Sequence, residues 1–192
     1  GQYDQNPEAL SPSGCAALYR RTMLEEAEYF DATLFAYGED LDIALRGRLL
    51  GYDCLYVPSA IAFHELSSST GGAVSPLKAF YVERNRLWVL IKYFPLMDIL
   101  LSPFYTALRY AYIVYGLTRR KGPASQYLKK FSGPGLLVTL LRTFLSAFQF
   151  LPYLLKERCR WKDRSRRSPE EMTRCLRRFQ ISARDAALKD LI

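Results

Sequence analysis

The second half of this sequence consists largely of apolar runs that are too interrupted to be simple membrane spans. Residues 87–117 contain no uninterrupted apolar stretch of about 18 residues, because five charged residues or prolines break them: Lys92, Pro95, Asp98, Pro103 and Arg109. Residues 131–155 contain a single charge, Arg142, whose burial in lipid costs about 2.5–3.5 kcal/mol and can be offset by the surrounding Leu and Phe. One span is therefore allowed in the second run, but it is not required.

Polar residues recur every three or four positions in the second run, at Thr139, Arg142, Thr143, Ser146 and Gln149. On a helix they form a narrow polar stripe opposite a broad apolar face. This pattern predicts a helix that lies in a membrane interface, although a helix packed into a soluble core would show the same periodicity.

Charge is distributed unevenly along the chain. Residues 1–64 hold 4 Lys and Arg against 10 Asp and Glu, a net charge of −6, whereas residues 65–192 hold 23 against 9, a net charge of +14. We expect the two parts to face different partners, polyhydroxyl or metal chemistry for the acidic part and an anionic membrane surface for the basic part. Nucleic acid is not expected, because the aromatic residues lie in apolar runs and not among the arginines.

Two further features of the sequence concern the cellular compartment and whether the domain is complete. The four cysteines form no CxxC pair, so reduced thiols in a cytosol-facing protein are expected. Residues 2–13 contain neither a secretory signal nor an apolar strand that leads into a glycine-rich loop. We therefore expect this chain to be part of a longer domain, without the unit that binds a nucleotide.

Residues 14–66 have the pattern of compact α/β structure. Helices are predicted over residues 21–29 and 40–50, the second ending at Gly51, and strand-like segments over residues 52–57 and 60–63. Asp42 and Arg46 lie four residues apart in the favourable order, which predicts that this helix face is solvated. Further helices are predicted over residues 77–90 and from Ser168 to Phe179, where Ser168 and Glu171 form a capping box.

Glu39 and Asp40 follow an aromatic loop, residues 35–38, and begin a predicted helix. Free N–H groups and the helix dipole favour a carboxylate at that position, and a carboxylate can accept a proton. Capping of the helix explains the same pair without any catalytic role. His64, the only histidine, is similarly ambiguous, because a lone histidine is more often structural than a ligand.

The ordered combination of motifs carries more information than any one of them. Together they resemble family 2 glycosyltransferases, and within them the rhamnosyltransferase-like branch that builds bacterial polysaccharides. The resemblance covers about residues 10–90 and rests on SGCAALYRR (13–21), FD (30–31), FAYGEDLD (35–42), Arg46, GY (51–52), VPSA (57–60), His64 and RN (84–85).

The resemblance implies the acceptor-side, C-terminal half of a Rossmann-like GT-A domain, followed by membrane-associated helices. Residues 1–90 are expected to form this partial domain, residues 91–155 the apolar helices and residues 156–192 a basic helical tail. The family aspartate matched by Asp40 is implied to deprotonate an acceptor hydroxyl in one inverting displacement, with Glu39 supporting its geometry. The donor is implied to be a nucleoside diphosphate sugar, and the acceptor a lipid-linked sugar or a polysaccharide.

The same resemblance implies further site residues. His64 matches a histidine that helps to hold a divalent cation, Mg²⁺ or Mn²⁺, on the donor diphosphate. The usual Asp-x-Asp ligands have no upstream equivalent here, and helical spacing turns the side chains of Asp40 and Asp42 apart. Gly14 matches a position of close backbone approach to the donor sugar or the acceptor, although a turn glycine without that role is an equal alternative. Arg84 and Asn85 are predicted to face the acceptor or the diphosphate, although a salt bridge on the helix surface with Glu83 or another acid is the safer interpretation.

Two functional classes therefore compete. The first is part of an inverting glycosyltransferase at the cytoplasmic face of the cell membrane, inactive without its donor half. The second is a non-catalytic membrane-associated module that binds glycan, lipid or a partner subunit.

Overall fold

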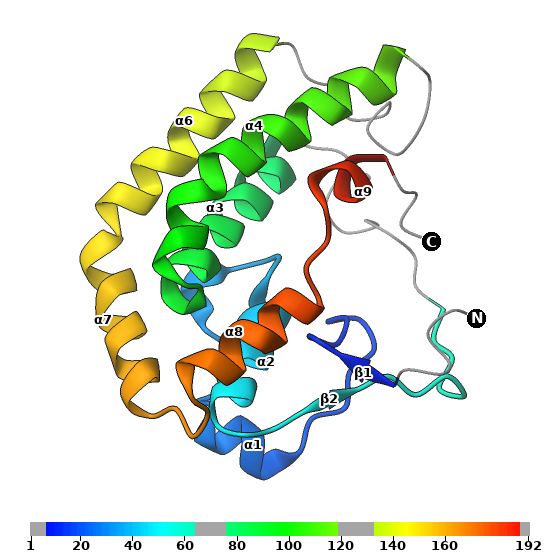
Figure 1. Ribbon diagram of the computed structural model, residues 1–192, viewed down its shortest axis with the longest axis vertical. Helices are drawn as coiled ribbons and strands as arrows, with labels where there is room; N and C mark the ends of the chain where they lie inside the picture. The colour runs from blue at the N-terminus through cyan, green and yellow to red at the C-terminus, as the bar shows by residue number, and fades with distance from the viewer. Residues whose placement is uncertain (1–6, 64–75, 119–132, 189–192) are drawn as a thin grey trace.

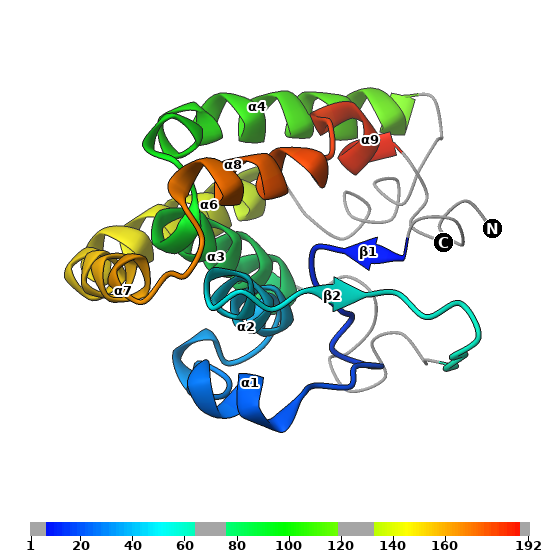
Figure 2. The same ribbon diagram turned by 60° about the horizontal axis from the view of Figure 1, so that its bottom comes forward.

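The computed structural model describes residues 7–63, 76–118 and 133–188, and these are mostly helical (Figure 1). The helices and strands in chain order are β1 (Glu8–Ala9), α1 (Arg21–Glu26), η1 (Ala32–Leu34), α2 (Glu39–Leu49), β2 (Cys54–Leu55), α3 (Pro76–Tyr93), α4 (Leu96–Thr118), α6 (Gly133–Gln149), α7 (Leu151–Asp163), α8 (Pro169–Arg178) and α9 (Ala183–Leu188). α3 packs against α6 and α7, and α4 packs against α9. In the second view, α4 lies at one side of the molecule and α1 at the opposite side (Figure 2).

Strand structure is much sparser than the expected α/β fold. Within the described residues β1 and β2 form a two-stranded antiparallel sheet, with Glu8 opposite Leu55 and Ala9 opposite Cys54. The predicted strand over residues 52–57 shrinks to two residues, and residues 60–63 form none. Two strands alone bury little apolar surface. The buried guanidinium of Arg48 ties them instead, through ion pairs with Glu8 (2.9 Å) and Asp53 (2.8 Å) and a hydrogen bond to the Ala9 carbonyl.

Helix boundaries follow local signals in the sequence. α2 begins one residue before the predicted position and is followed by Gly51, whose φ of 90° suits the left-handed turn after a helix. α1 ends at Glu26, earlier than predicted, because Glu28 and Tyr29 adopt positive φ. α8 has the predicted capping box between Ser168 and Glu171.

The face of α2 that carries Asp42 and Arg46 is buried, so the prediction that it is solvated is wrong. Asp42 is 0% exposed and Arg46 4% exposed. The Asp42 carboxylate pairs with Arg46 Nη2 (2.7 Å) and Lys92 Nζ (3.0 Å), and it accepts a hydrogen bond from the Tyr93 hydroxyl (2.8 Å). The i, i+4 spacing predicted the pair correctly, but α3 covers it.

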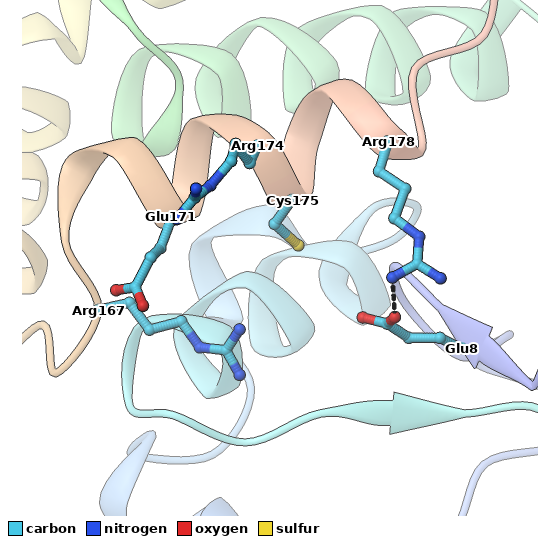
Figure 3. A pocket seen from close by; sticks show the side chains of 6 residues that line it. All are labelled: Glu8, Arg167, Glu171, Arg174, Cys175 and Arg178. Carbon is cyan, nitrogen blue, oxygen red and sulfur yellow. Dashed lines mark hydrogen bonds and ion pairs between the residues drawn. The ribbon is translucent and has the colours of Figure 1, made fainter.

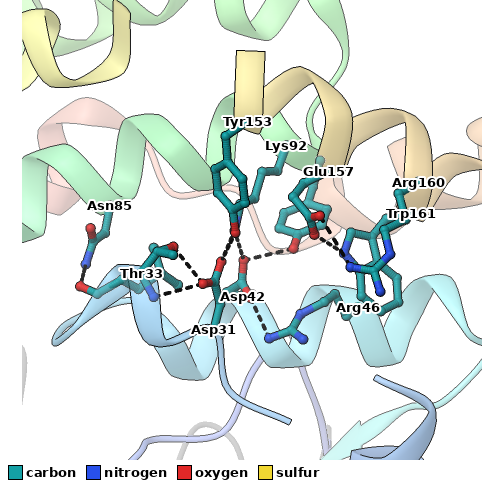
Figure 4. A network of polar contacts seen from close by, with 12 residues as sticks. Asp31, Thr33, Asp42, Arg46, Asn85, Lys92, Tyr153, Glu157, Arg160 and Trp161 are labelled. Atoms are coloured by element: carbon teal, nitrogen blue, oxygen red, sulfur yellow. Dashed lines mark hydrogen bonds and ion pairs between the residues drawn. The ribbon is translucent and has the colours of Figure 1, made fainter. Parts of the chain in front are cut away.

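A second carboxylate, Asp31, joins this network from the segment before η1 (Figure 4). It pairs with Lys92 Nζ at 2.6 Å and accepts hydrogen bonds from the Tyr153 hydroxyl (3.0 Å) and from Thr33. Burial raises the pKa of Asp31, but the charge of Lys92 and the hydrogen bonds from Lys92 and Thr33 outweigh it and lower this pKa to about 2. Lys92 therefore joins α2, α3 and the segment before η1, and Tyr153 adds α7.

Helices α4 and α6 carry polar residues on their buried sides and apolar residues on their exposed sides. Thr139 and Thr143 of α6 and Ser102 and Thr106 of α4 are buried. The large exposed side chains are Leu137, Leu141, Phe144, Leu145 and Phe148 on α6, and Leu96, Leu100, Leu101, Phe104 and Leu108 on α4. Thr139 and Thr106 each donate to the carbonyl four residues earlier, which satisfies their hydroxyls within the helix.

No single helix among the described residues is long and apolar enough to cross a bilayer, although α6 and α7 would pass such a test as a pair bent by 62°. The run over residues 131–155 is thus divided by a bend at Phe150, and Pro152 lies in the first turn of α7. Pro103, by contrast, is accommodated inside α4.

The acidic and basic parts of the chain bind each other, which corrects the expectation that they face different partners. Arg160 and Arg164 pair with Glu28, and Arg166 pairs with Glu26. Further along the tail, Arg167 pairs with Asp53 and Arg178 with Glu8. Much of the basic tail therefore neutralises the N-terminal part within the same molecule.

We predict that Lys92→Met lowers the free energy of unfolding by about 3–5 kcal/mol, because removing one partner leaves buried carboxylates without their counter-charge. Urea denaturation measures the change. Lys162→Met, at an exposed position in the last turn of α7, is the matched control and should change stability by less than about 0.5 kcal/mol. Equal stability of the two variants would show that Lys92 does not hold the network together.

Candidate functional site

Asp40 lies in the first turn of α2, beside the exposed segment that contains Gly14. Its Oδ2 accepts a hydrogen bond from the Gly14 N–H at 3.1 Å, and its Oδ1 accepts one from the Leu41 N–H at 2.8 Å. The side chain is partly exposed, and residues 13–18 next to it are exposed as well. The carboxylate is thus oriented by backbone N–H groups while it remains open to solvent on one side.

The carboxylates of Glu39 and Asp40 give the site a local negative character that Tyr19 senses. Burial raises the pKa of Tyr19, and the charges of Asp40, Cys54 and Glu39 raise it further. Glu39 Oε2 is buried and has no hydrogen-bond partner among the described residues. The predicted supporting role of Glu39 is not tested by these contacts and stays a prediction.

The aromatic loop before α2 has an unusual backbone. Phe35, Tyr37 and Gly38 have φ values of 63°, 68° and 86°, in a region that bulky residues rarely adopt. Such a conformation persists only where the surroundings hold it. Gly38 is also close to Asn85, because an added Cβ would lie 3.5 Å from the Cβ of that residue.

Asn85 and Arg84 hold this loop in place. Asn85 Nδ2 donates to the carbonyls of Leu34 (2.9 Å), Ala36 (2.8 Å) and Tyr37 (2.6 Å). Arg84 Nη2 donates to the carbonyls of Thr33 (3.0 Å) and Leu34 (2.9 Å). These residues position the loop that leads into Glu39 and Asp40.

The sequence resemblance predicted Arg84 and Asn85 to face substrate, and the structure places them against the loop instead. The alternative that Arg84 pairs with Glu83 is wrong, because Glu83 is buried between Arg86 (3.2 Å) and Arg109. The sequence motif predicted that Asn85 lies near the site. The structure adds that its amide nitrogen binds three backbone carbonyls. Direct contact with substrate stays a prediction.

Gly14 contacts the site through its N–H and not through a steric requirement inside this chain. A Cβ added there would lie no closer than 3.6 Å to Asp40 Oδ2, which is an ordinary van der Waals contact. Gly14 lies in a turn closed by the hydrogen bond from the Ala16 N–H to the Ser13 carbonyl, and its close approach to a bound substrate stays a prediction.

Asp40 and Asp42 do not form a metal-binding pair. Asp42 is buried against Lys92 and Arg46, whereas Asp40 faces Gly14. Across residues 7–63, 76–118 and 133–188, no group of three or more His, Cys, Asp or Glu could hold a metal ion. His64, the predicted metal ligand, lies outside the described residues. These residues do not fit the predicted Mg²⁺ or Mn²⁺ site.

Asp40 lines neither of two surface pockets among the described residues. The first, about 260 Å³, is lined by Glu8, Glu171, Cys175 and three arginines of the basic tail, of which Arg178 pairs with Glu8 (Figure 3). The second, about 290 Å³, lies between α2 and α3 and begins at Tyr37 and Gly38, directly before Glu39 and Asp40. No side chain predicted from the sequence as a site residue lines the first, and Asn85 lines the second.

Comparison with known proteins identifies the family of the chain. The chain matches the family model described as glycosyl transferase family group 2 over residues 2–156, and it belongs to that family. It is thus a glycosyltransferase domain. No curated protein and no solved structure matches it significantly.

We predict that Asn85→Ala releases the aromatic loop. Loss of three hydrogen bonds to carbonyls should lower the free energy of unfolding by about 1–3 kcal/mol and speed chymotrypsin cleavage after Phe35 and Tyr37. Mass spectrometry of the products, with cleavage after exposed Phe30 as internal reference, measures the second effect. Gln180→Ala, at an exposed position, is the control, and an unchanged cleavage pattern in Asn85→Ala would contradict the clamp.

Proposed function

We propose that this chain supplies the acceptor side of an inverting glycosyltransferase, with Asp40 as the general base. The observation that supports it best is the orientation of Asp40 by the N–H groups of Gly14 and Leu41, on the side of α2 that faces the exposed residues 13–18. A carboxylate used only as a cap would be expected to bond the N–H groups two or three residues ahead. Asp40 bonds the Leu41 N–H, one residue ahead, and also the Gly14 N–H, 26 residues away.

In the proposed step, an acceptor hydroxyl gives its proton to an Asp40 carboxylate oxygen. The hydroxyl oxygen forms a bond to the anomeric carbon of the donor sugar as the bond to the nucleoside diphosphate breaks, with inversion at that carbon. The nucleoside diphosphate leaves with the electron pair of the broken bond. The chain itself provides the base and its orientation.

The Rossmann-like GT-A architecture, the nucleotide sugar and the divalent cation belong to this proposal as family-based inferences. The family match supports sugar transfer, and family members commonly use a nucleotide sugar and a divalent metal. The described residues do not fit the metal, and the proposed transfer step uses the carboxylate of Asp40 without it. In this proposal, the donor-binding part of the enzyme determines which sugar is transferred and which linkage is formed.

We predict that Asp40→Asn in the full-length enzyme lowers the rate of sugar transfer by about 10²–10⁴-fold, because the amide cannot accept the hydroxyl proton. The assay follows transfer of radiolabelled sugar to acceptor. Asp163→Asn, at an exposed position of α7, is the control and should retain full activity. Near-wild-type turnover of Asp40→Asn, with melting temperatures matched, would reject Asp40 as the base. Absence of transfer by the wild-type full-length protein would instead favour a non-catalytic role that binds glycan, lipid or a partner subunit.

We further propose that α4 and α6 contact the cytoplasmic face of the cell membrane with their exposed apolar sides. Ser102 and Thr106 of α4 and Thr139 and Thr143 of α6 face the protein, whereas many Leu and Phe residues of the two helices face outward, although Arg142 and Gln149 of α6 are exposed as well. Phe148 is 78% exposed, whereas Thr143 is 3% exposed. Contiguous exposed apolar surface of this kind is typical of a membrane or protein interface.

The basic tail adds a weaker electrostatic contribution to this proposal. Arg160, Arg164, Arg166 and Arg167 are paired with acids of the same chain. Lys156 and Lys162 of α7 are exposed and remain available to anionic lipid. The apolar sides of α4 and α6 are therefore expected to contribute most of the binding.

We predict that the 192-residue chain floats with liposomes of phosphatidylcholine and phosphatidylglycerol, and that Phe144→Ser, Leu145→Ser and Phe148→Ser together weaken this binding at least tenfold. Each large apolar side chain removed from lipid loses on the order of 1.5–3 kcal/mol. The matched control replaces Leu18, Ile61 and Phe63, which are equally exposed but lie outside α4 and α6. Equal loss in both triple variants would mean that α6 has no special contact with lipid.

A further inference from the structure

The pocket between α2 and α3 starts directly beside the proposed base. Tyr37 and Gly38 line one end, and Glu39 and Asp40 are the next residues along the chain. Its volume of about 290 Å³ is at the lower end of the range for ligand sites. Any molecule held there lies next to the start of α2.

The lining of this pocket is apolar and is unsuited to a sugar or a nucleotide. Leu41 contributes from α2, Val82, Val89 and Leu90 contribute from α3, and Phe94 lies at the far end. Asn85 also lines it, but its amide nitrogen already donates to the carbonyls of the aromatic loop. With so few polar groups to bind hydroxyls, the pocket favours a hydrocarbon.

Cationic side chains lie on the same side of α3 as the pocket. Lys78, Val82 and Arg86 follow each other at intervals of four, so they share one face of the helix. Lys78 Nζ lies 5.3 Å from the centre of the Tyr37 ring. Arg86 lines the pocket, and its side chain is 30% exposed.

Local charge around Arg86 is positive. Arg86 and Arg109 both pair with the single carboxylate of Glu83, and Arg86 also donates to the Thr106 hydroxyl at 2.8 Å. Two guanidinium groups thus share one acid. This end of the pocket is complementary to an anion, because it carries excess positive charge at the surface.

The positive charge and the apolar residues are distributed differently along α3. Lys78 lies in the first turn of α3, close to Tyr37, and Arg86 lies just past the middle of the helix, whereas Phe94 lies beyond its C-terminal end. Twelve residues separate Val82 from Phe94, which corresponds to about 18 Å along a helix. Leu96 and Met97, at the start of α4, are exposed and continue the apolar character beyond Phe94.

We propose that this pocket binds a single-chain lipid phosphate, the carrier of the sugar acceptor, with its phosphate near Lys78 and Arg86 and its hydrocarbon between α2 and α3. This inference rests on the proposed function, since it names the acceptor class of the same site. A carrier held in this direction places its phosphate-linked sugar near Asp40 and directs its chain towards the exposed apolar residues of α4.

The test uses the 192-residue chain and farnesyl phosphate below its micelle concentration, with binding measured by isothermal titration calorimetry. Val82→Trp fills the pocket and should weaken binding at least tenfold. Leu55→Trp, at an exposed position of β2, adds the same side chain elsewhere and should leave the dissociation constant within twofold of the wild type. Lys78→Met should weaken binding of farnesyl phosphate several-fold and leave binding of farnesol unchanged.

Competing ligands separate the head from the chain. Inorganic phosphate alone, farnesol alone and a dispersed two-chain phosphatidylglycerol should each bind at least tenfold more weakly than farnesyl phosphate. Equal binding of any of these three, or equal binding by Val82→Trp and the wild type, overturns the proposal. If Val82→Trp does not fold, photo-cross-linking of a diazirine-bearing farnesyl phosphate decides instead, with labelling expected at Leu41 or within residues 82–94 and labelling elsewhere contradicting the site.

The result can be distinguished from failure of the proposed function. Asp40→Asn should bind farnesyl phosphate with unchanged affinity, because this variant changes the base and not the pocket. Unchanged binding together with full transfer activity of Asp40→Asn would overturn the base alone. Loss of transfer in Asp40→Asn without farnesyl phosphate binding to any variant would overturn the lipid site alone.

Discussion

The ammonium group of Lys92, placed between the carboxylates of Asp31 and Asp42, is the interaction on which the arrangement of the site depends. It joins the segment before η1 to α2 and α3, and the hydroxyls of Tyr93 and Tyr153 donate to the same two carboxylate oxygens that Lys92 contacts. A buried ion cluster gives little net stability, because desolvation offsets most of the Coulomb attraction. Its effect is on specificity, since any other register of α2 against α3 would leave these charges unpaired.

The aromatic loop is fixed between this network and Asn85. Asp31 anchors its start through Thr33, and the amide of Asn85 binds its last carbonyls before α2 begins. Positive φ at Phe35 and Tyr37 is sustained because both ends are held. The direction in which Asp40 leaves α2 follows from this geometry, so residues of α3 that contact no substrate still determine where a proton can be accepted.

Local features of the site could be predicted from sequence, and long-range ones could not. The start of α2, the capping box of α8 and the position of Asp40 depend on neighbouring residues, and the structure has them as predicted. Burial of Asp42 and Arg46, the loop contacts of Asn85 and the pairing of Glu28 with Arg160 depend on segments 50 or more residues apart. An i, i+4 pair of charged residues has the same sequence pattern whether solvent or another helix covers it. Likewise, the net charge of a segment does not show which residues its charges pair with.

The polar buried side of α4 follows from the same internal pairing. The buried surfaces of α3 are partly polar, with Glu83, Asn85 and Lys92 among them, so neighbouring helices bring hydroxyls and guanidinium groups to meet them. Thr106 and Arg109 of α4 do so directly. Apolar residues of α4 are then left on the outside, where a hydrocarbon phase solvates them better than water. One polar core thus positions the base and also leaves outward an apolar surface suited to a lipid-borne acceptor.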